Sequence, residues 1–364
     1  MASISAGVTL MRRATSPAAI GFMPVAVHFR LFDVLVTFKE PVSAESVLAA
    51  YKEIAKKDGV ESPSPADTLF AIAGLEFVDV TSDELYCAND ITRHLAAFPS
   101  AQHGVLHFAT EALLGAAFLM PKLKAQNFAY PFEELDTPIQ YAYRRMGNER
   151  LAQKHTYSIM AEQGRMDSFN TFMVGKWMKI DSVPERLKSV GYDLQSVLDE
   201  GTANRSQTMV DIGGGRGQLL LEIKEAFPQL KASDLVVQEF NHDLGDIEGV
   251  TLVEWDFKAE NSPQPIKGAL VYHLAHVLHN LPDLEAARLL QKISQAMAPH
   301  SRLLIHEFSK NESFAKLHAT MIVLYGGRER SSSEFQQLAA LAGLKVTYEV
   351  RPEVGDGLIE MRKA

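Results

Sequence analysis

From about Ser206 to the C-terminus, short runs of apolar and β-branched residues alternate with longer amphipathic runs. A short apolar run bounded by turn residues predicts a strand, and apolar residues three and four apart predict a helix. Strands that alternate with helices along a chain build a parallel sheet covered by helices. We therefore predict a doubly wound, mostly parallel α/β sheet, whose last two strands are close in sequence and pair as an antiparallel edge. The predicted strands lie in TMVDIG, LVVQEF, VTLVEWDF, ALVYHLAHV, RLLIHEF, KVTYEV and LIEMRK.

The pattern before this region is helical and divides into two zones. Residues 99–200 contain helical runs rich in aromatic residues and methionine, which most often form a core. In residues 1–98, a helix is expected from Ser43 to Lys57, and FVDVTSDELYC alternates around a polar turn as a small hairpin does. Helices followed by a hairpin suggest a winged-helix-like module. We therefore predict one domain over residues 1–98 and a second over 99–364, the latter divided into 99–200 and 201–364.

Charge argues against a nucleic-acid partner. The 364-residue chain has a net charge of −9, and the helix that would enter a groove, ADTLFAIAGLEF, carries Asp67 and Glu76 but no lysine or arginine. A winged-helix-like module without basic residues is better explained as a dimerisation or substrate-lid module.

Cysteine content and hydropathy bear on the compartment. Cys87 is the only cysteine, which excludes an internal disulfide and a cysteine-based metal cluster and fits a reducing compartment. Arg12 and Arg13 in an acid-poor N-terminal segment raise the possibility of a transit peptide, but the helical apolar pattern continues from Ile20 to Leu35. We expect a cytoplasmic protein with no membrane partner, since no apolar run is expected to reach the length of a bilayer span.

Polar and glycine residues follow three successive predicted strands. VDIGGGRGQ joins a strand to a helix, Glu239 ends the next strand, and Asp256 and Phe257 end the third. A dinucleotide fingerprint starting at Gly213 would require glycine where the chain has Gln218. A glycine turn, an acid for a ribose and an acid–aromatic pair for a purine favour an adenosine ligand without a pyrophosphate, such as S-adenosylmethionine.

The stretch YHLAHVLHNLPD spaces His273, His276 and His279 three residues apart. Three metal ligands, three structural histidines, or one base with two bystanders all fit this spacing. Side chains of residues 273 and 276 on one strand point to opposite faces, which disfavours a shared metal.

VDIGGGRG, VVQEF, EWDF, VLHNLPD, LLIHE and GGRERSSSEF occur in the order and approximate spacing of the plant and fungal S-adenosylmethionine-dependent O-methyltransferases. The chain resembles the fungal secondary-metabolite branch from about residue 20 to the end. The resemblance implies a helical substrate-pocket region and a Rossmann-like cofactor-binding region. It implies that the residues that bind S-adenosylmethionine or S-adenosylhomocysteine are Asp211, Gly213, Gly215, Glu239, Asp256 and Phe257. The acidic winged-helix-like zone and the apolar helix before it predict a homodimer in which the N-terminal segment packs on its partner.

In this family the histidine of the motif that VLHNLPD resembles is the general base, and His279 holds that position. Glu307 and Glu329 are implied as its orienting carboxylates, whereas His273 and His276 have no role and no metal is expected. Imidazole assistance to a phenol is worth roughly 10²–10⁴-fold in rate. The chain departs from the family at Asn280 and Leu281, where Asp and Trp are more usual, and at Ala275, where a Lys or Arg often contacts the cofactor.

The resemblance also implies an acceptor pocket in which Phe169, Met173 and Met321 hold a flat substrate, with Thr320 as the alternative to Met321. We therefore predict methyl transfer to a hydroxyl of a small aromatic or polyketide-like metabolite. The alternative is a related pericyclase or dehydratase that keeps the cofactor without transferring methyl. An intact His279, Glu307 and Glu329 favours methyl transfer.

Overall fold

The computed structural model describes residues 5–55, 65–174, 181–203, 208–240 and 245–364. The chain forms two compact units. The N-terminal unit comprises Met1–Ala117 and Tyr157–Lys179, and the sheet unit comprises Phe118–Thr156 and Ile180–Ala364. These units do not follow the predicted division at residue 98. Helices from both sides of that position pack together within the N-terminal unit.

The N-terminal unit is helical, with one small sheet. Its core contains Phe32, Leu35, Leu69 and Ile72, all fully buried. The predicted hairpin is present as an antiparallel pair, with Val80 opposite Tyr86. The helix expected from Ser43 to Lys57 begins at Ala44, and its predicted end lies outside the described residues. The elements are α1 (Ala6–Ile20), α2 (Met23–His28), α3 (Leu31–Leu35), α4 (Ala44–Ala55), α5 (Pro65–Ala73), β1 (Asp79–Val80), β2 (Tyr86–Cys87), α6 (Asp90–Ala97), α7 (Pro99–His107), the π-helix η1 (Phe108–Ala112), α11 (Thr156–Glu162) and α12 (Met166–Val174).

Helices α7, η1 and α8 (Leu113–Ala125) follow one another without a break over Pro99–Ala125. This 27-residue helix is long and apolar enough to span a bilayer by length and composition. The expectation that no run reaches that length is therefore wrong. Hydropathy alone is weak evidence for a span, since core helices meet the same criterion, and Glu111 within it is buried in an ion pair with Arg165 at 3.0 Å.

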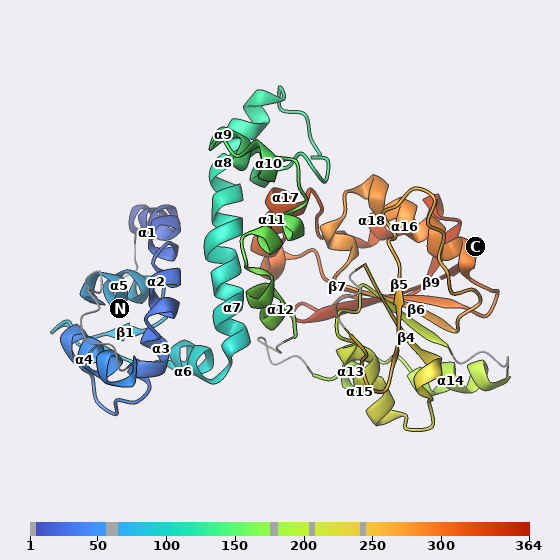
Figure 1. The fold of residues 1–364 in the computed structure, drawn as a ribbon, viewed down its shortest axis with the longest axis horizontal. Helices are drawn as coiled ribbons and strands as arrows, with labels where there is room; N and C mark the ends of the chain where they lie inside the picture. Colours follow the sequence, from blue (N-terminus) through green and yellow to red (C-terminus); the bar gives the residue numbers. More distant parts are fainter. Residues whose placement is uncertain (1–4, 56–64, 175–180, 204–207, 241–244) are drawn as a thin grey trace. The chain divides into compact units, whose positions relative to one another are not determined.

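The sheet unit contains the predicted doubly wound sheet, drawn in Figure 1 with helices on both sides. Its strand order is β5-β4-β3-β6-β7-β9-β8, and β3 to β7 are parallel. The strands are β3 (Met209–Ile212), β4 (Leu235–Glu239), β5 (Thr251–Glu254), β6 (Val271–Ala275), β7 (Arg302–Phe308), β8 (Leu344–Val350) and β9 (Asp356–Lys363). The helices are α9 (Pro138–Arg145), α10 (Glu149–Ala152), α13 (Val183–Ser189), α14 (Leu194–Ala203), α15 (Gln218–Ala226), α16 (Asp283–Ala296), α17 (Ala315–Tyr325) and α18 (Ser332–Leu341), together with the short 3₁₀ helices η2 (Ala232–Asp234), η4 (Leu278–Asn280) and η5 (Glu312–Phe314).

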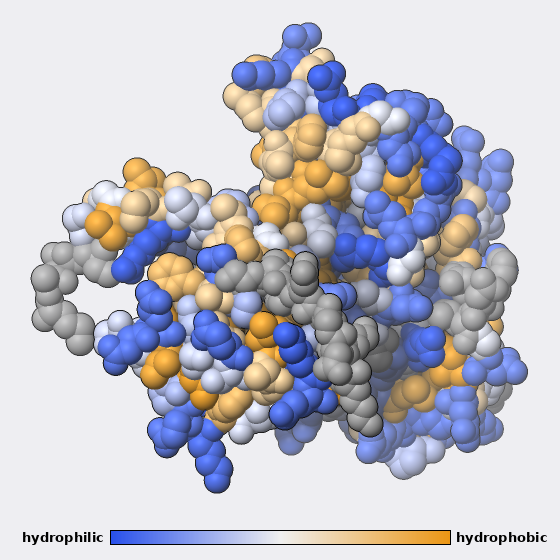
Figure 2. Space-filling view, turned by 60° about the vertical axis from the view of Figure 1, so that its left-hand side comes forward, coloured by the Kyte–Doolittle hydropathy of each residue, from blue (hydrophilic) through white to orange (hydrophobic). Residues whose placement is uncertain are grey.

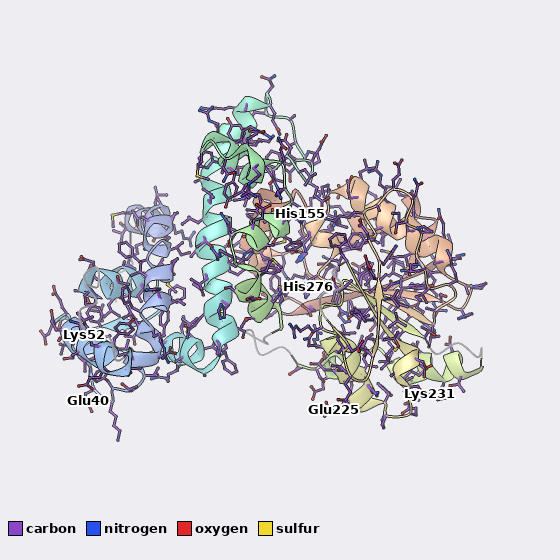
Figure 3. All side chains as sticks on the ribbon, viewed as in Figure 1. Glu40, Lys52, His155, Glu225, Lys231 and His276 are labelled. Atoms are coloured by element: carbon purple, nitrogen blue, oxygen red, sulfur yellow. The ribbon has the colours of Figure 1, made fainter. Side chains whose placement is uncertain are left out.

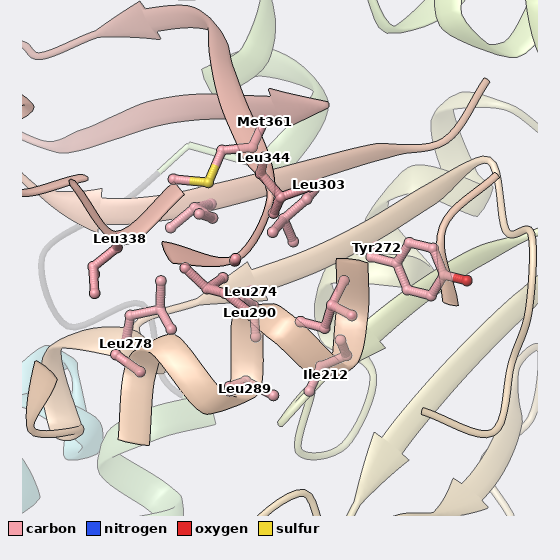
Figure 4. Packing of buried hydrophobic residues seen from close by; sticks show 14 of the residues in the cluster. Ile212, Tyr272, Leu274, Leu278, Leu289, Leu290, Leu303, Leu338, Leu344 and Met361 are labelled. Carbon is pink, nitrogen blue, oxygen red and sulfur yellow. The ribbon is translucent and has the colours of Figure 1, made fainter. Parts of the chain in front are cut away.

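Alternation along the strands divides the core of the sheet unit into two layers. Ile212, Leu274 and Leu303 face α16 and α18, and Figure 4 shows them packed against Leu289, Leu290 and Leu338. Met209, Val271 and Leu304 face the opposite layer, formed with α13, α14 and α15. Successive strand residues point to opposite faces, so a single strand supplies both layers.

The last two strands pair as predicted, but only one of them is an edge. β9 is antiparallel to both β7 and β8, so β8 is the outer strand. The first six residues of β9 are buried accordingly, from Asp356 to Met361. This position places Asp356, the first residue of β9, opposite Phe308 at the end of β7.

Candidate active site

The glycine turn after β3 is shaped by two of its residues. Gly214 lies so close to Asp211 that a Cβ there would be 2.4 Å from Oδ2. Gly215 has a φ of 56°, and a Cβ there would meet no atom within 4 Å. The turn therefore leaves open space above Gly215, and only glycine follows this backbone path without strain.

Glu239, at the end of β4, faces the same turn. Its Oε1 accepts the Gly215 N–H at 2.7 Å, and its Oε2 accepts the N–H of Phe240 at 3.2 Å. Burial raises the pKa of this carboxyl and outweighs the two hydrogen bonds, which lower it. The structure thus brings Glu239 and Gly215 together, as a site that holds a ribose beside the turn requires.

Two more of the predicted cofactor residues, Asp256 and Phe257, follow β5. Oδ1 of Asp256 accepts the backbone N–H groups of Lys258 at 2.9 Å and Ala259 at 3.2 Å, so this oxygen shapes the loop. The Phe257 ring packs edge-on against Trp255 with centroids 6.0 Å apart.

Asp211 belongs to a buried polar chain across three strands. Its Oδ1 lies 2.8 Å from Nδ1 of His273, and Nε2 of His273 lies 2.6 Å from Nδ1 of His306. Burial lowers the pKa of His306 well below its ordinary value, and the positive charges around it act in the same direction. His273 is therefore committed to a hydrogen-bonded chain that ties β3 to β6 and β7.

His279 lies in η4, directly after β6, between two carboxylates. Its Nδ1 is 2.8 Å from Oε1 of Glu329 and 3.4 Å from Oε2 of Glu307. Its backbone N–H donates to Oε1 of Glu307 at 3.1 Å. Within the described part of the chain, Nε2 of His279 makes no hydrogen bond, which leaves that nitrogen as the one that can accept a proton.

Two neighbouring residues bring Glu329 to this histidine. A Cβ at Gly327 would lie 2.1 Å from the carbonyl oxygen of His279, so the chain after α17 passes η4 at a distance that only glycine permits. Arg330 is 1% exposed and donates to the carbonyls of Leu278 at 2.6 Å and Leu281 at 2.7 Å. Sequence reasoning did not single out either residue, although both belong to the GGRERSSSEF motif.

Burial alone would lower the pKa of His279, but the charge of Glu307 and the hydrogen bond to Glu329 outweigh it and raise the pKa to about 9. The same burial raises the pKa of Glu307. The raised pKa favours the imidazolium form of His279 at neutral pH, and a base at this position has to release that proton before it acts.

His276 does not behave as a bystander. It follows the last residue of β6 with a φ of 53°, so it leaves the strand, and its ring lies 5.5 Å from that of His279 between centroids. Its Nε2 is 3.2 Å from Oδ1 of Asp356, and its Nδ1 is 3.9 Å from Oε2 of Glu307. The three histidines do not share one site, as predicted. His276 and His279, however, lie close together, whereas His273 does not join them. Figure 3 labels His276 in the sheet unit.

His276, His279 and Glu307 each offer an atom within 4.8 Å of the others, a spacing that a cation could use. Nδ1 of His279, however, lies between two carboxylates at 2.8 Å and 3.4 Å, as a protonated nitrogen does. We therefore interpret these side chains as a proton-handling cluster.

The predicted acceptor residues lie in different units. Met321 is buried in α17 of the sheet unit, whereas the neighbouring Thr320 hydroxyl bonds the carbonyl of Lys316 at 3.1 Å. In α12 of the N-terminal unit, the Phe169 ring contacts those of His107 at 5.2 Å and Tyr157 at 5.4 Å, and Met173 is 53% exposed. Their role as one pocket stays a prediction.

Comparison with known proteins supplies the identity. A family model described as an O-methyltransferase domain matches residues 188–345. The O-methyltransferase bfoE of Aspergillus brasiliensis is 48% identical over 98% of this chain and 96% of its own. The O-methyltransferase aunE of Aspergillus niger is 49% identical over 94% of this chain and 99% of its own. The chain belongs to the O-methyltransferase family.

Solved structures show the same fold for this O-methyltransferase. LepI in complex with S-adenosylmethionine has a TM-score of 0.81 at 22% identity and covers 99% of this chain and 90% of its own. A pericyclic reaction enzyme has the same TM-score and coverage at 21% identity. S-adenosylmethionine is the cofactor of the enzyme, and the open turn at Gly215 with Glu239 beside it fits that molecule.

The raised pKa of His279 predicts how the stability of the methyltransferase depends on pH. The pKa is about 9 in the folded protein against an ordinary 6.5, so the stabilisation is complete below pH 6.5 and is lost as pH rises through 9. The unfolding free energy of the wild type relative to His279→Gln should fall by up to about 3 kcal/mol between roughly pH 6 and pH 9.5. Urea unfolding of both proteins across this range measures the difference. A difference that stays constant with pH would show that the two carboxylates do not hold this proton.

Proposed function

We propose that the enzyme methylates a hydroxyl of a small aromatic or polyketide-like secondary metabolite, with His279 as the general base. The observation that carries this proposal is the position of His279. Its Nδ1 is held by Glu329 and Glu307, and its Nε2 makes no hydrogen bond in the described structure. A histidine oriented by carboxylates on one nitrogen is equipped to take a proton on the other.

S-adenosylmethionine, when bound, supplies a methyl group on a positively charged sulfur. The residues of this chain do the remaining work. Glu239 and the turn at Gly215 would hold the adenosine, and Nε2 of His279 would take the proton of the acceptor hydroxyl. Glu307 and Glu329 would stabilise the imidazolium that results.

The proposal is tested by incubating the purified enzyme with methyl-labelled cofactor and a panel of phenols and hydroxylated polyketides, with mass spectrometry of the products. Mass spectrometry of the protein under non-denaturing conditions would first identify bound cofactor or product. We expect the labelled methyl group on a hydroxyl oxygen of at least one acceptor, with S-adenosylhomocysteine formed in equal amount.

A second function is favoured by one finding, the match in fold to a pericyclic reaction enzyme. In that case a cyclised or dehydrated product forms only with cofactor bound, and labelled methyl never enters the product. His279 would then act on the substrate as a hydrogen-bond donor or acid. The absence of product label in every reaction that consumes substrate would select this alternative.

We propose that the enzyme is a homodimer formed through its winged-helix-like N-terminal region, and that it is cytoplasmic. α1 has no buried residue, and Leu10 and Met11 are 68% and 58% exposed. Figure 2 shows hydrophobic residues, in orange, among hydrophilic ones on the face drawn. An apolar helix surface of this kind is stabilised by a second chain. Light scattering should give a mass near twice 40.2 kDa.

The Leu10→Asp, Met11→Asp double variant should shift that mass toward the monomer, and Arg13→Asp on the same helix should not. A monomer mass for the wild type across micromolar concentrations would refute the dimer. A fluorescent fusion that enters an organelle would refute the cytoplasmic location.

A further inference from the structure

His276 lies beside the base cluster formed by His279, Glu307 and Glu329, and the methyl-transfer chemistry does not use it. Its ring stands between Asp356 at 3.2 Å and Glu307 at 3.9 Å. The backbone fixes this position, because the His276 N–H donates to the carbonyl of His306 at 3.0 Å and its carbonyl accepts from Nδ2 of Asn280 at 3.1 Å. Histidine tolerates the positive φ at this position better than most side chains.

The two carboxylates of the base cluster favour the protonated form of His279, and a positive charge on His276 would counteract them. Two carboxylates, Glu307 and Glu329, act on one imidazole at 3.4 Å and 2.8 Å. Opposite charges this close favour the protonated imidazole, whereas a general base has to give its proton up. A positive charge on the far side of Glu307 weakens the hold of that carboxylate on His279.

We propose that His276, anchored by Asp356, carries a positive charge that offsets Glu307 and thereby makes proton release from His279 easier than the two carboxylates alone would allow. His276 is thus a positioning residue that tunes the base. The inference rests on the proposed function, in which His279 is that base.

Two acidic side chains, Asp356 and Glu307, face His276. Asp356 lies on β9 and forms an ion pair with Arg186 of α13 as well as with His276. Burial would raise the pKa of Asp356, but the contacts with His276 and Arg186 outweigh it and hold that pKa below its ordinary value, so the carboxylate stays ionised.

On the other side of the ring, Glu307 of β7 is buried. Among the described residues neither its Oε2 nor Nδ1 of His276 has a hydrogen-bond partner, and these two atoms lie 3.9 Å apart. The ring of Phe308 covers the His276 ring at a centroid distance of 4.6 Å, and the pKa of His306 is lowered well below its ordinary value, so His306 adds no competing positive charge at neutral pH. Arg330 is a further charge near the base, and it opposes protonation of His279.

The test measures the ionisation of His279 in two independent ways, in the wild type and in His276→Asn. Asparagine accepts the positive φ and removes the charge. The acid limb of the pH profile of kcat/KM reports the base in the free enzyme, and a histidine-labelled NMR titration follows the His279 ring directly. We expect both to move upward by about one to two pH units in the variant, which lowers kcat/KM about 10- to 100-fold on the acid limb and lets it recover as pH rises.

Three further variants test whether the charge of His276 causes the shift. His276→Lys should return the limb toward the wild-type position, since it restores the charge. His276→Gly, which also tolerates the backbone conformation, should repeat the shift if the asparagine variant folds poorly. His155→Asn is the matched control, because it removes a histidine 3.2 Å from another carboxylate, Glu134, and should leave the His279 titration unchanged.

An unchanged His279 titration in folded His276→Asn or His276→Gly would overturn the inference, whatever happens to activity. If instead the wild type transfers no methyl group, the proposed function fails, while the NMR titration still decides whether His276 tunes His279.

Discussion

Replacing His279 by alanine is expected to lower turnover about 10²–10⁴-fold, because proton removal from the acceptor is lost while the cofactor site is left intact. Cofactor affinity, measured by calorimetry, should stay nearly unchanged. The physical reason is that the base and the cofactor residues belong to different elements. His279 lies in η4 after β6, whereas the open turn follows β3 and Glu239 ends β4. Steady-state kinetics with a saturating labelled cofactor measures the loss.

His273→Ala is the control for this experiment. His273 is tied to Asp211 and His306, so its loss should appear as lower thermal stability and not as a comparable fall in turnover of the folded enzyme. Equal losses at His273, His276 and His279, reversed by added zinc, would refute the single base and favour a metal site instead.

Glu239→Ala should weaken S-adenosylmethionine binding by about 10- to 100-fold, the loss expected when a hydrogen bond to a charged group is removed. Gly215→Val should weaken binding strongly as well, because valine disfavours a φ of 56° and its side chain would occupy the open space above the turn. Calorimetric titration with the cofactor measures both effects.

Glu225→Ala provides the comparison, since it removes an exposed carboxylate from α15, the helix that follows the same turn. It should bind the cofactor as the wild type does. Tight binding of NADH, with no response to S-adenosylmethionine, would contradict the assignment of this turn.

The local pattern of the sequence was sufficient for the elements of the sheet unit. All seven predicted strands are present in the expected runs, because each is a short apolar segment bounded by turns and helices. The position of β9 could not be predicted in the same way. Whether a strand lies at an edge depends on which strand from elsewhere in the chain pairs with its free side, here β7.

The site shows the same limit. The motifs named Glu307 and Glu329, but the contact that brings Glu329 to His279 depends on the backbone at Gly327 and on Arg330, two effects that arise only when η4 and the chain after α17 are packed. His276 was set aside because the family resemblance gives it no role and because strand alternation directs it to the face opposite His273. The left-handed backbone conformation of His276 ends the alternation one residue after β6, and the sequence pattern around it does not predict this conformation.

The close passage of Gly327 beside His279 constrains how this enzyme can change its substrate. α17 carries Met321, the predicted acceptor contact, and the same continuous segment carries Glu329, the partner of the base. Between them, Gly327 has no room for a side chain.

Substitutions or insertions in α17 that reshape acceptor recognition will therefore also displace the carboxylate that orients His279. Acceptor range and proton transfer are linked in this segment, and a directed-evolution library placed there should yield mostly inactive enzymes. Phe169 and Met173, the predicted acceptor residues on α12, do not belong to the segment that carries Glu329, so a library at these two positions is the better starting point for redesign.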